Sequence, residues 1–242
     1  VRRLLRAKKA GHTGSLDPAA TGMLPLCFGE ATKVCAFLLD ADKTYRVTAK
    51  LGVATDTGDA DGQETARADV PSLTATDWNG ILQGFLGESM QVPPMFSALK
   101  QDGKRLYELA RKGETVERKP RPIGIDAIEL LEIAGTRLVF RVHCSKGTYI
   151  RTLVEDIAAK AGTVAHTASL HRETVGAFKA ADMLDMGKLE ADAEAGDEVL
   201  KGRLLPPDAA LETYPALELD GENAAKFSAG QEISLPGDSR EG

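Results

Sequence analysis

The segment GHTGSLDPAATG, residues 11–22, has a composition suited to a chemically active loop. Glycines and hydroxyl residues surround its single carboxylate, Asp17. Pro18 disfavours helical geometry at Asp17, so a short, rigid loop could hold this acid in one position. From the segment alone, an Asp-Pro turn on the surface is the more common interpretation. A phosphate-binding loop is excluded, because the GxxxxGK[ST] pattern is absent.

A second segment, CSKGTYIRT at 144–152, places Tyr149 and Arg151 where a strand or turn enters a helix. An arginine there could bind a carboxylate through two parallel hydrogen bonds. The alternative is a tyrosine half-buried in the core and an arginine at its rim. Tyr45, in DKTYRV, is likewise of a type that is common in sheets.

No spacing in the chain indicates a metal site. The loop TGDADG at 57–62 fits the calcium-loop pattern poorly, because Thr57 and Ala68 would occupy its first and twelfth ligand positions. The four histidines lack an HExxH spacing, and the three cysteines form no CxxC pair. We therefore predict no bound metal, no disulfide, and a polar turn at 57–62.

Charge is divided unevenly along the chain. The net charge is −6, but residues 182–242 carry 15 acidic and 5 basic side chains, leaving 25 basic and 21 acidic in residues 1–181. Five basic residues fall within residues 1–9, and eight basic against four acidic residues fall within 100–121. These basic stretches are compatible with an RNA partner, although solvated faces would have the same composition.

The apolar pattern predicts an α+β fold with a mixed, mainly antiparallel sheet and flanking helices. Strands are expected at 23–28, 44–51, 121–133, 137–144 and 165–175, and helices at 2–9, 30–39, 75–86 and 148–161. The stretch 91–119 is expected to form a Pro-rich turn, a short strand and a short basic helix. Together these elements must bring the loop at 11–22 and the segment at 144–152 to the sheet.

Composition also suggests the domain organisation. We expect a catalytic domain at 1–181, an RNA-binding insertion within it at 101–119, a helical connector at 182–205, and the start of a shortened RNA-binding appendage at 206–242. The basic opening of the chain is followed by a polar loop instead of an apolar signal segment. No apolar run approaches the roughly 18 residues that span a bilayer. We therefore expect a cytoplasmic protein.

Five segments, in order, resemble the TruB family of tRNA pseudouridine-55 synthases over residues 1–180. They are GHTGSLDPAATGMLPLCFGEATKV, DKTYRVTAKLGVATDTGDADG, QVPPMFSALKQDGKRLYELARKG, CSKGTYIRTLVEDIA and SLHRETVGAF. The family usually begins some thirty residues earlier, with a strand that this sequence lacks. The resemblance implies a sheet of the pseudouridine synthase type, and it favours the functional interpretation of each segment above.

The resemblance also implies residue roles. Asp17 corresponds to the aspartate that attacks the target nucleotide, and Arg151 to the arginine paired with it. Tyr45 corresponds to a tyrosine that packs on the flipped uracil and assists proton removal from C5. The remaining matches are His12, which supports the displaced nucleotide, and Tyr149 and Leu170, which line the pocket; His171 stands where an arginine is commoner.

The implied activity is isomerisation of uridine 55 in the TΨC stem-loop of tRNA, by a monomer that needs no cofactor and no protein partner. The insertion would contact the RNA backbone through Lys104, Arg105, Arg111 and Lys112. Two other functions are retained: a guide-RNA-dependent pseudouridine synthase of ribosomal RNA, and a noncatalytic chaperone of tRNA folding. The sequence leaves open whether Asp17 attacks C6 or C1′ or assists elimination at C2′.

Overall fold

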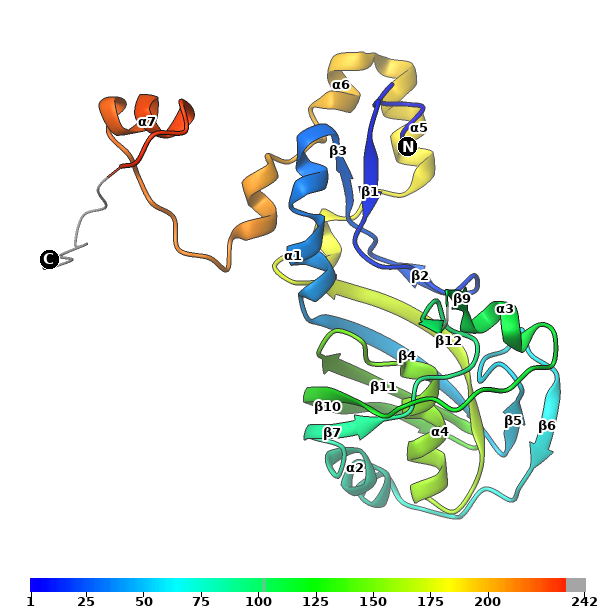
Figure 1. Cartoon of the computed structure of the whole chain (residues 1–242). Coiled ribbons are helices and arrows are strands. Elements are labelled where there is room, and N and C mark those ends of the chain that lie inside the picture. The colour runs from blue at the N-terminus through cyan, green and yellow to red at the C-terminus, as the bar shows by residue number, and fades with distance from the viewer. Residues whose placement is uncertain (102, 234–242) are drawn as a thin grey trace, which may run out of the picture.

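A six-stranded mixed sheet forms the centre of the protein (Figure 1). The computed structural model describes residues 1–101 and 103–233. The strands lie in the order β2-β12-β4-β11-β10-β7. Their bounds are Thr21–Gly22 for β2, Lys43–Leu51 for β4, Gly87–Gln91 for β7, Arg121–Ala134 for β10, Arg137–Cys144 for β11 and Ala165–Val175 for β12. Only the β2–β12 pair of this sheet is parallel, so the predicted fold class is confirmed.

The long strands form because apolar residues alternate along them, which gives each strand one buried face. On β4 the buried apolar side chains are Val47, Ala49 and Leu51. On β11 they include Phe140 and Val142, and the register places Phe140 opposite Val47. This pairing aligns the apolar face of one strand with that of the next.

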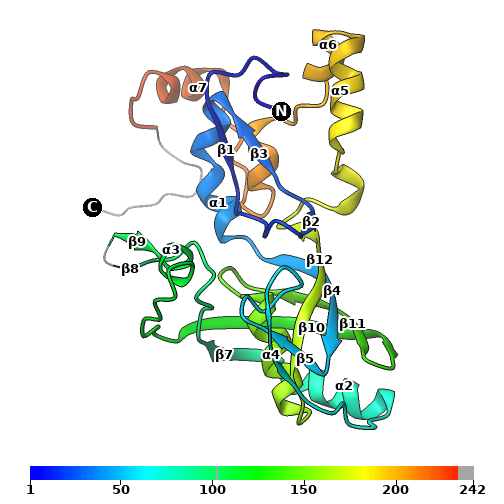
Figure 2. The ribbon, with the colours of Figure 1, turned by 90° about the vertical axis from the view of Figure 1, so that its right-hand side faces the viewer.

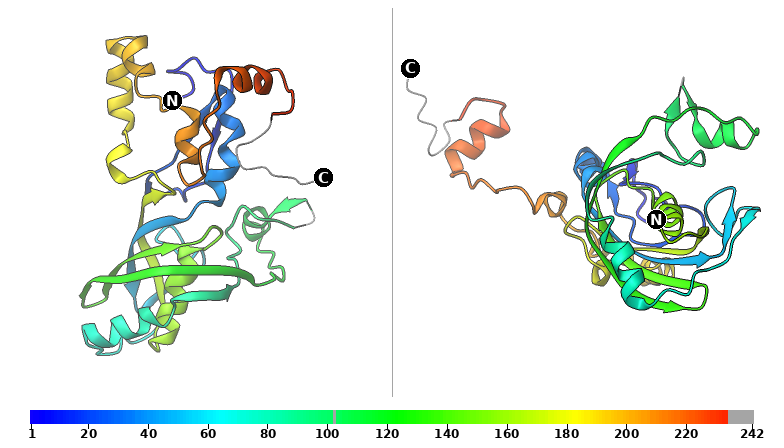
Figure 3. Two further views of the ribbon diagram at one scale, coloured as in Figure 1. Left: turned by 90° about the vertical axis from the view of Figure 1, so that its left-hand side faces the viewer. Right: turned by 90° about the horizontal axis from the view of Figure 1, so that it is seen from below.

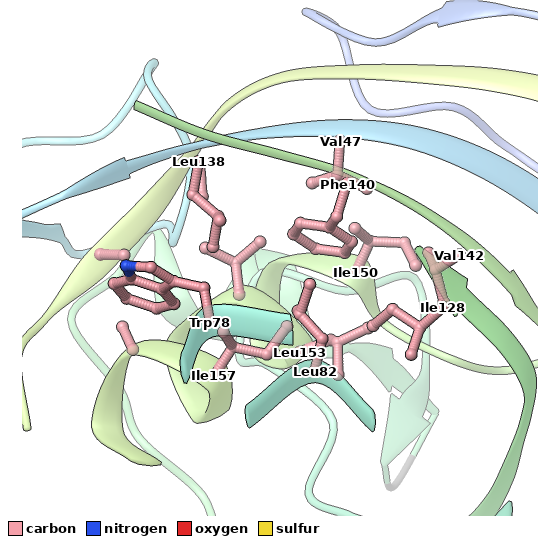
Figure 4. Packing of buried hydrophobic residues seen from close by; sticks show 14 of the residues in the cluster. Val47, Trp78, Leu82, Ile128, Leu138, Phe140, Val142, Ile150, Leu153 and Ile157 are labelled. Carbon is pink, nitrogen blue, oxygen red and sulfur yellow. The ribbon is translucent and has the colours of Figure 1, made fainter. Parts of the chain in front are cut away.

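Two helices cover this apolar face (Figures 1 and 4). Helix α2, Ala75–Gln83, begins at a Thr74–Asp77 capping box and contributes Trp78 to the core. Helix α4, Ile150–Lys160, has six buried side chains, recurring at the three- and four-residue spacing of one helical face. Its first residue follows Tyr149, so the apolar face of α4 fixes the position of the predicted site residues at its beginning.

The N-terminal segment and the segment after β12 lie together above the sheet (Figures 1 and 2). This region contains β1 (Ala10–His12), β3 (Leu26–Phe28), η1 (Gly29–Lys33), α1 (Cys35–Asp40), η2 (Ala180–Asp182), α5 (Met186–Ala195), α6 (Asp197–Lys201) and η3 (Pro207–Leu211). Residues 182–205 therefore include two helices. The helix α7, Gly221–Ser228, follows at the end of the described chain (Figure 3), and residues 234–242 of the expected appendage lie outside the described residues.

Two sequence predictions for the N-terminal segment are wrong in detail. Residues 2–9 form turns instead of a helix, and Arg6 has a φ of +49°. The strand expected at 23–28 begins only at Leu26, after Pro25, whose nitrogen cannot donate to a strand partner. The pairing of β1 with β3 explains the first error, because strand pairing at Ala10 overrides the helical preference of the preceding residues.

Short strands and one short helix branch from the sheet. The hairpin β5–β6 (Val53–Thr55, Glu64–Arg67) encloses the loop 56–63. The insertion region contains β8 (Lys100–Gln101), β9 (Lys104–Arg105) and α3 (Leu106–Ala110), while its residue 102 lies outside the described part. The sequence predicted one short strand and a basic helix here, but there are two short strands, and α3 itself carries no basic residue because the cations lie just before and after it. No helix among the described residues combines the length and the hydropathy needed to cross a bilayer.

The core packing leads to a stability prediction. Phe140 is fully buried between β4, β10 and the helices (Figure 4). Phe140→Ala should lower the free energy of unfolding by about 3–5 kcal/mol, because it removes a large side chain and leaves a cavity. Urea denaturation measures this loss. Phe227→Ala, at a residue that is 65% exposed, is the matched control and should change stability by less than about 0.5 kcal/mol; equal losses in the two variants would contradict the assignment of the core.

Candidate active site

The segment with Asp17 is a closed loop anchored at both ends. At its start, the Thr13 amide donates to the Pro25 carbonyl at 3.3 Å, and at its end, β2 pairs with β12. Gly22 has a φ of +99°, and a Cβ there would lie 2.2 Å from the Arg172 carbonyl oxygen. This position therefore requires glycine, because the loop end approaches β12 too closely for any side chain.

Asp17 forms an ion pair with Arg151. Arg151 Nη2 donates to Asp17 Oδ1 at 3.1 Å, and Arg151 Nε lies 2.9 Å from Asp17 Oδ2. The Nε contact lacks the geometry of a hydrogen bond, so the pair is held by one hydrogen bond and by charge. The pairing expected from the sequence is confirmed, across 134 residues of chain.

The other partners of Arg151 fix the guanidinium in place. Nη1 donates to the Thr57 carbonyl and Nη2 to the Phe96 carbonyl, each at 2.8 Å. Asp59 Oδ2 lies 3.5 Å from Nη1. The Arg151 side chain is only 7% exposed, whereas that of Asp17 is 38% exposed. Arg151 is thus a buried support, and Asp17 is the member of the pair that a substrate can reach.

The loop 56–62, expected to be a polar turn, supplies part of this support. Asp59 Oδ1 accepts from the Thr57 hydroxyl at 2.6 Å and from the Asp61 amide at 3.2 Å. The loop joins β12 through a hydrogen bond from the Thr167 amide to the Gly58 carbonyl. The Asp- and Gly-rich composition of this loop was a visible signal, but the sequence did not show that Asp59 would lie next to Arg151.

Burial and two neighbouring charges together set the acidity of Asp17. Burial raises the pKa of this carboxyl most strongly, the Arg151 guanidinium lowers it, and the Asp59 carboxylate raises it. The net pKa lies above the ordinary value for aspartate. Arg151 favours the ionised form, as the sequence suggested, but burial outweighs it. A carboxylate that is partly desolvated, and whose negative charge is only partly balanced by a neighbouring cation, is a stronger nucleophile than one in free solution.

Tyr45 and Leu170 lie on the face of the sheet that α4 covers. The register places Leu170 opposite Val47 and Tyr45 opposite Arg172, and alternation puts all four on one face. Both Tyr45 and Leu170 pack against the hydrophobic core while remaining partly exposed. Burial raises the pKa of Tyr45, and the Arg172 guanidinium opposes that rise.

Tyr149 is held at the start of α4 by a buried glutamine. The Gln91 side chain accepts from the Tyr149 amide at 2.8 Å and donates to the Tyr149 carbonyl at 3.1 Å. The tyrosine side chain is partly buried, and burial raises the pKa of its phenol. Gln91 was not identified from the sequence, because nothing in QVPP marks its partner 58 residues away.

The remaining predicted residues are more exposed. His12 ends β1 opposite Leu26, five residues before Asp17. The four basic residues chosen in the insertion, Lys104, Arg105, Arg111 and Lys112, are all exposed. The guanidinium carbons of Arg105 and Arg111 lie 5.9 and 5.3 Å from the centre of the Tyr107 ring. Two of the four cations are therefore held on one aromatic side chain.

One group of side chains within the described residues could hold a cation. Ligand atoms of Asp42, Asp126 and His143 lie within 4.8 Å of one another, and the two carboxylates are exposed. His143 Nδ1 bonds the Thr44 hydroxyl at 3.0 Å, and its Nε2 lies 3.9 Å from Asp126. Exposed acidic groups often meet without an ion, and this group includes none of the predicted site residues.

Family comparisons agree with this geometry. Residues 2–150 match the TruB family pseudouridylate synthase N-terminal domain, and residues 151–212 match the tRNA pseudouridylate synthase B C-terminal domain. The chain belongs to the TruB family of pseudouridylate synthases. The boundary between the two matches falls between Ile150 and Arg151. The Asp17–Arg151 pair therefore links the first matched region to the second.

Individual relatives in the TruB family are similar over nearly the whole chain. The tRNA pseudouridine synthase B of Dechloromonas aromatica is 51% identical over 98% of this chain and 78% of its own length. That of Haemophilus influenzae is 50% identical over 97% of this chain and 75% of its own.

Solved structures share the fold. A chain in the crystal structure of a Cbf5–Nop10–Gar1 complex has a TM-score of 0.74 at 28% identity, over 96% of this chain. One in the archaeal box H/ACA sRNP Nop10–Cbf5 complex has a TM-score of 0.70 at 26% identity, over the same share of this chain. This TruB-family chain spans 61% of the length of each.

The geometry of this site predicts the effect of Asp59 on Asp17. Asp59→Asn should lower the pKa of Asp17, because it removes a negative charge that disfavours ionisation while keeping an acceptor for Thr57 and Asp61. A pH titration of the Asp17 carboxyl carbon by NMR measures the shift. The control Asp61→Asn, an exposed change in the same loop, should leave the Asp17 titration in place. A titration midpoint unchanged in Asp59→Asn would show that the Asp59 charge does not reach the site.

Proposed function

We propose that this protein isomerises uridine to pseudouridine at position 55 in the TΨC loop of tRNA, with Asp17 as the catalytic carboxylate. The observation that carries the proposal is the Asp17–Arg151 pair, in which a partly exposed carboxylate rests on a buried guanidinium. The names of the relatives, tRNA pseudouridine synthase B, support tRNA as the substrate. The position within tRNA rests on the five sequence segments described above.

The reaction breaks the N1–C1′ bond, rotates the base and joins C1′ to C5. The reactants and product have the same composition and oxidation state, so the chemistry needs no cofactor. Asp17 can add to C6 of the base, add to C1′ of the sugar with departure of uracil, or stabilise the charge while the C2′ proton leaves. In each route the acid must be ionised and fixed, and Arg151 satisfies the second requirement through its four neighbours.

The target base must leave its stack to reach Asp17. Tyr45 offers a flat, partly exposed ring on the sheet face, and Leu170 adds an apolar surface two positions along β12 from Arg172. Base stacking on an aromatic side chain is worth roughly 1–3 kcal/mol. Tyr149 lies two residues before Arg151, at the start of α4. These side chains would surround the uracil without contributing a formal charge.

Two further properties belong to this proposal. The substrate is a folded tRNA, so we place the protein in the cytoplasm. We also propose that it acts as a monomer, since the site is built from one chain.

The alternative of a guide-RNA-dependent enzyme is less well supported. The chains from the Cbf5–Nop10–Gar1 complex and the archaeal box H/ACA sRNP Nop10–Cbf5 complex are 28% and 26% identical to this chain, whereas the tRNA pseudouridine synthase B relatives are about 50% identical. A noncatalytic tRNA-folding chaperone is the alternative from another class, and it would use the same basic surface. It would not require a fixed, ionised Asp17.

We predict that Asp17→Asn lowers the rate of isomerisation on the order of 10,000-fold or more, while tRNA binding remains within about threefold. The amide keeps the shape of the carboxylate but is not nucleophilic. Tritium release from labelled uridine and filter binding measure the two quantities. Asp69→Asn, at an exposed aspartate, is the control and should keep the wild-type rate. Near-normal turnover by Asp17→Asn would refute the catalytic assignment. A wild type that promotes tRNA folding but forms no pseudouridine would favour the chaperone function.

The insertion leads to a prediction on RNA binding. Replacing Lys104, Arg105, Arg111 and Lys112 with alanine should raise the dissociation constant of a TΨC stem-loop. The dependence of binding on salt should also flatten by up to about three in log–log slope, because each lost phosphate contact removes about 0.7–0.9 of slope. The rate at saturating RNA should fall much less, since these side chains position the backbone.

The matched control removes exposed charges elsewhere on the protein. Lys50, Arg137 and Lys160 are exposed and lie at the opposite ends of their elements from the site. Their replacement with alanine should leave the salt dependence close to that of the wild type. If the insertion variant binds RNA as the wild type does, with the same slope, the insertion is a solvated face and the RNA surface lies elsewhere.

A further inference from the structure

Arg172 is a buried cation that the site described so far does not use. It lies on β12, is 2% exposed, and its Nε donates to the Met23 carbonyl at 2.6 Å. Its Nη2 is buried and has no hydrogen-bond partner among the described residues. A buried guanidinium with a spare donor is costly to maintain unless something binds it.

Arg172 contacts both ends of the loop that carries Asp17. At the loop end, the Arg172 carbonyl accepts from the Met23 amide at 2.8 Å, in addition to the side-chain bond to Met23. At the loop start, a Cβ built on Gly14 would lie 3.8 Å from Arg172 Nη1. The guanidinium therefore lies beside the two glycine-containing ends of the loop, and a change in its position would move Asp17.

The same side chain lies beside Tyr45. The two residues are direct partners in the antiparallel β4–β12 pair, so their side chains project from the same face, with Cβ atoms about 5 Å apart. An irregularity in the pairing follows Arg172 immediately, before Thr174. Such bulges redirect side chains and are frequent next to active sites.

The charged and titratable groups around Tyr45 have opposing effects. Burial raises the pKa of its phenol, and Arg172 on β12 is the strongest influence that lowers it. Cys144 on β11 and Asp17 in the loop raise that pKa further. Among these neighbours, Arg172 is the one that favours the ionised phenol.

We propose that Arg172 is a positioning residue for the isomerisation, which ties the Asp17 loop to β12 and places a fixed positive charge beside the Tyr45 hydroxyl. This inference rests on the proposed function. In the step concerned, the Tyr45 phenolate takes the proton from C5 of the rejoined base. The C5–H electron pair becomes the C5=C6 bond, the former C6=N1 bond opens toward N1, and N1 gains a proton from water. Arg172 stabilises the phenolate before the transfer and does not touch the base.

Kinetics of a double-mutant cycle test whether Arg172 acts through Tyr45. Arg172→Met should lower the single-turnover rate on the order of 100-fold, the usual size of a general-base effect, with little change in RNA binding. Arg172→Lys, which keeps the charge, should recover part of the rate. In a Tyr45→Phe background, Arg172→Met should cost much less than in the wild type. Equal losses in both backgrounds, with no recovery in Arg172→Lys, would overturn the proposal.

A titration without RNA tests the charge effect independently of activity. 3-Fluorotyrosine, whose phenol ionises at lower pH, would replace the four tyrosines, and ¹⁹F NMR would follow each one. The Tyr45 signal is assigned by its loss in Tyr45→Phe. In Arg172→Met the pKa of this phenol should rise, because a neighbouring positive charge is removed. An unchanged titration of Tyr45 would overturn the inference even if the wild type forms pseudouridine.

Arg46→Met is the matched control for both measurements. Arg46 adjoins Tyr45 on β4 but is exposed and projects from the opposite face. It should leave the Tyr45 titration and the coupling to Tyr45 unchanged. Thermal unfolding of each variant identifies any variant that fails to fold. If Arg172→Met is one of these, Arg172→Lys is compared with the wild type in its place. Failure of the wild type to form pseudouridine would instead refute the proposed function, and the ¹⁹F titration would still decide the role of Arg172.

Discussion

The Arg151 guanidinium joins four parts of the chain that are remote in sequence. It pairs with Asp17 from the N-terminal loop. In the loop after β5 it lies near the Asp59 carboxylate and donates to the Thr57 carbonyl. It also donates to the Phe96 carbonyl, which precedes the insertion. Its own backbone belongs to the first turn of α4. Because burying a guanidinium is costly without hydrogen bonds and opposite charge, these segments together stabilise Arg151 in its place. The geometry of the candidate site depends on this one buried charge.

Arg151 can occupy that position only because α4 is fixed by the hydrophobic core. The helix buries Leu153 and Ile157 against the sheet, and Gln91 on β7 holds the backbone of Tyr149 just before it. A side chain at the start of a helix anchored in this way moves little relative to the sheet. The sheet in turn carries Tyr45 and Arg172 on adjacent strands. The core therefore sets the distance between Asp17 and the Tyr45 ring.

The electrostatics of the site are a balance of like and unlike charges. Two carboxylates, Asp17 and Asp59, share the Arg151 guanidinium, while a second buried guanidinium, Arg172, lies on β12. Burial raises the pKa of Asp17 more than Arg151 lowers it. Such a carboxylate is less stabilised than one in a closed salt bridge, as the proposed role of Asp17 requires. Stability and reactivity are thus set by the same few contacts.

Local sequence determined much of this protein by itself. Alternation predicted the strands β4, β10, β11 and β12, and the helical spacing predicted α4, because each pattern reflects a single periodic face. The ordered motifs identified Asp17, Tyr45 and Arg151. The turns at residues 2–9 were decided by strand pairing between β1 and β3, which local propensity does not contain. The late start of β3 follows from Pro25, a local signal that the sequence prediction did not weigh.

The roles of Asp59, Gln91 and Arg172 likewise appeared only in the tertiary structure. Each acts through a partner tens of residues or more away in the sequence: Arg151, Tyr149 and Met23. A sequence specifies which residue types are present and their local periodicity. Which buried charges and carbonyls come together depends on the packing of α4 and the loops on the sheet, and that packing is a property of the whole fold.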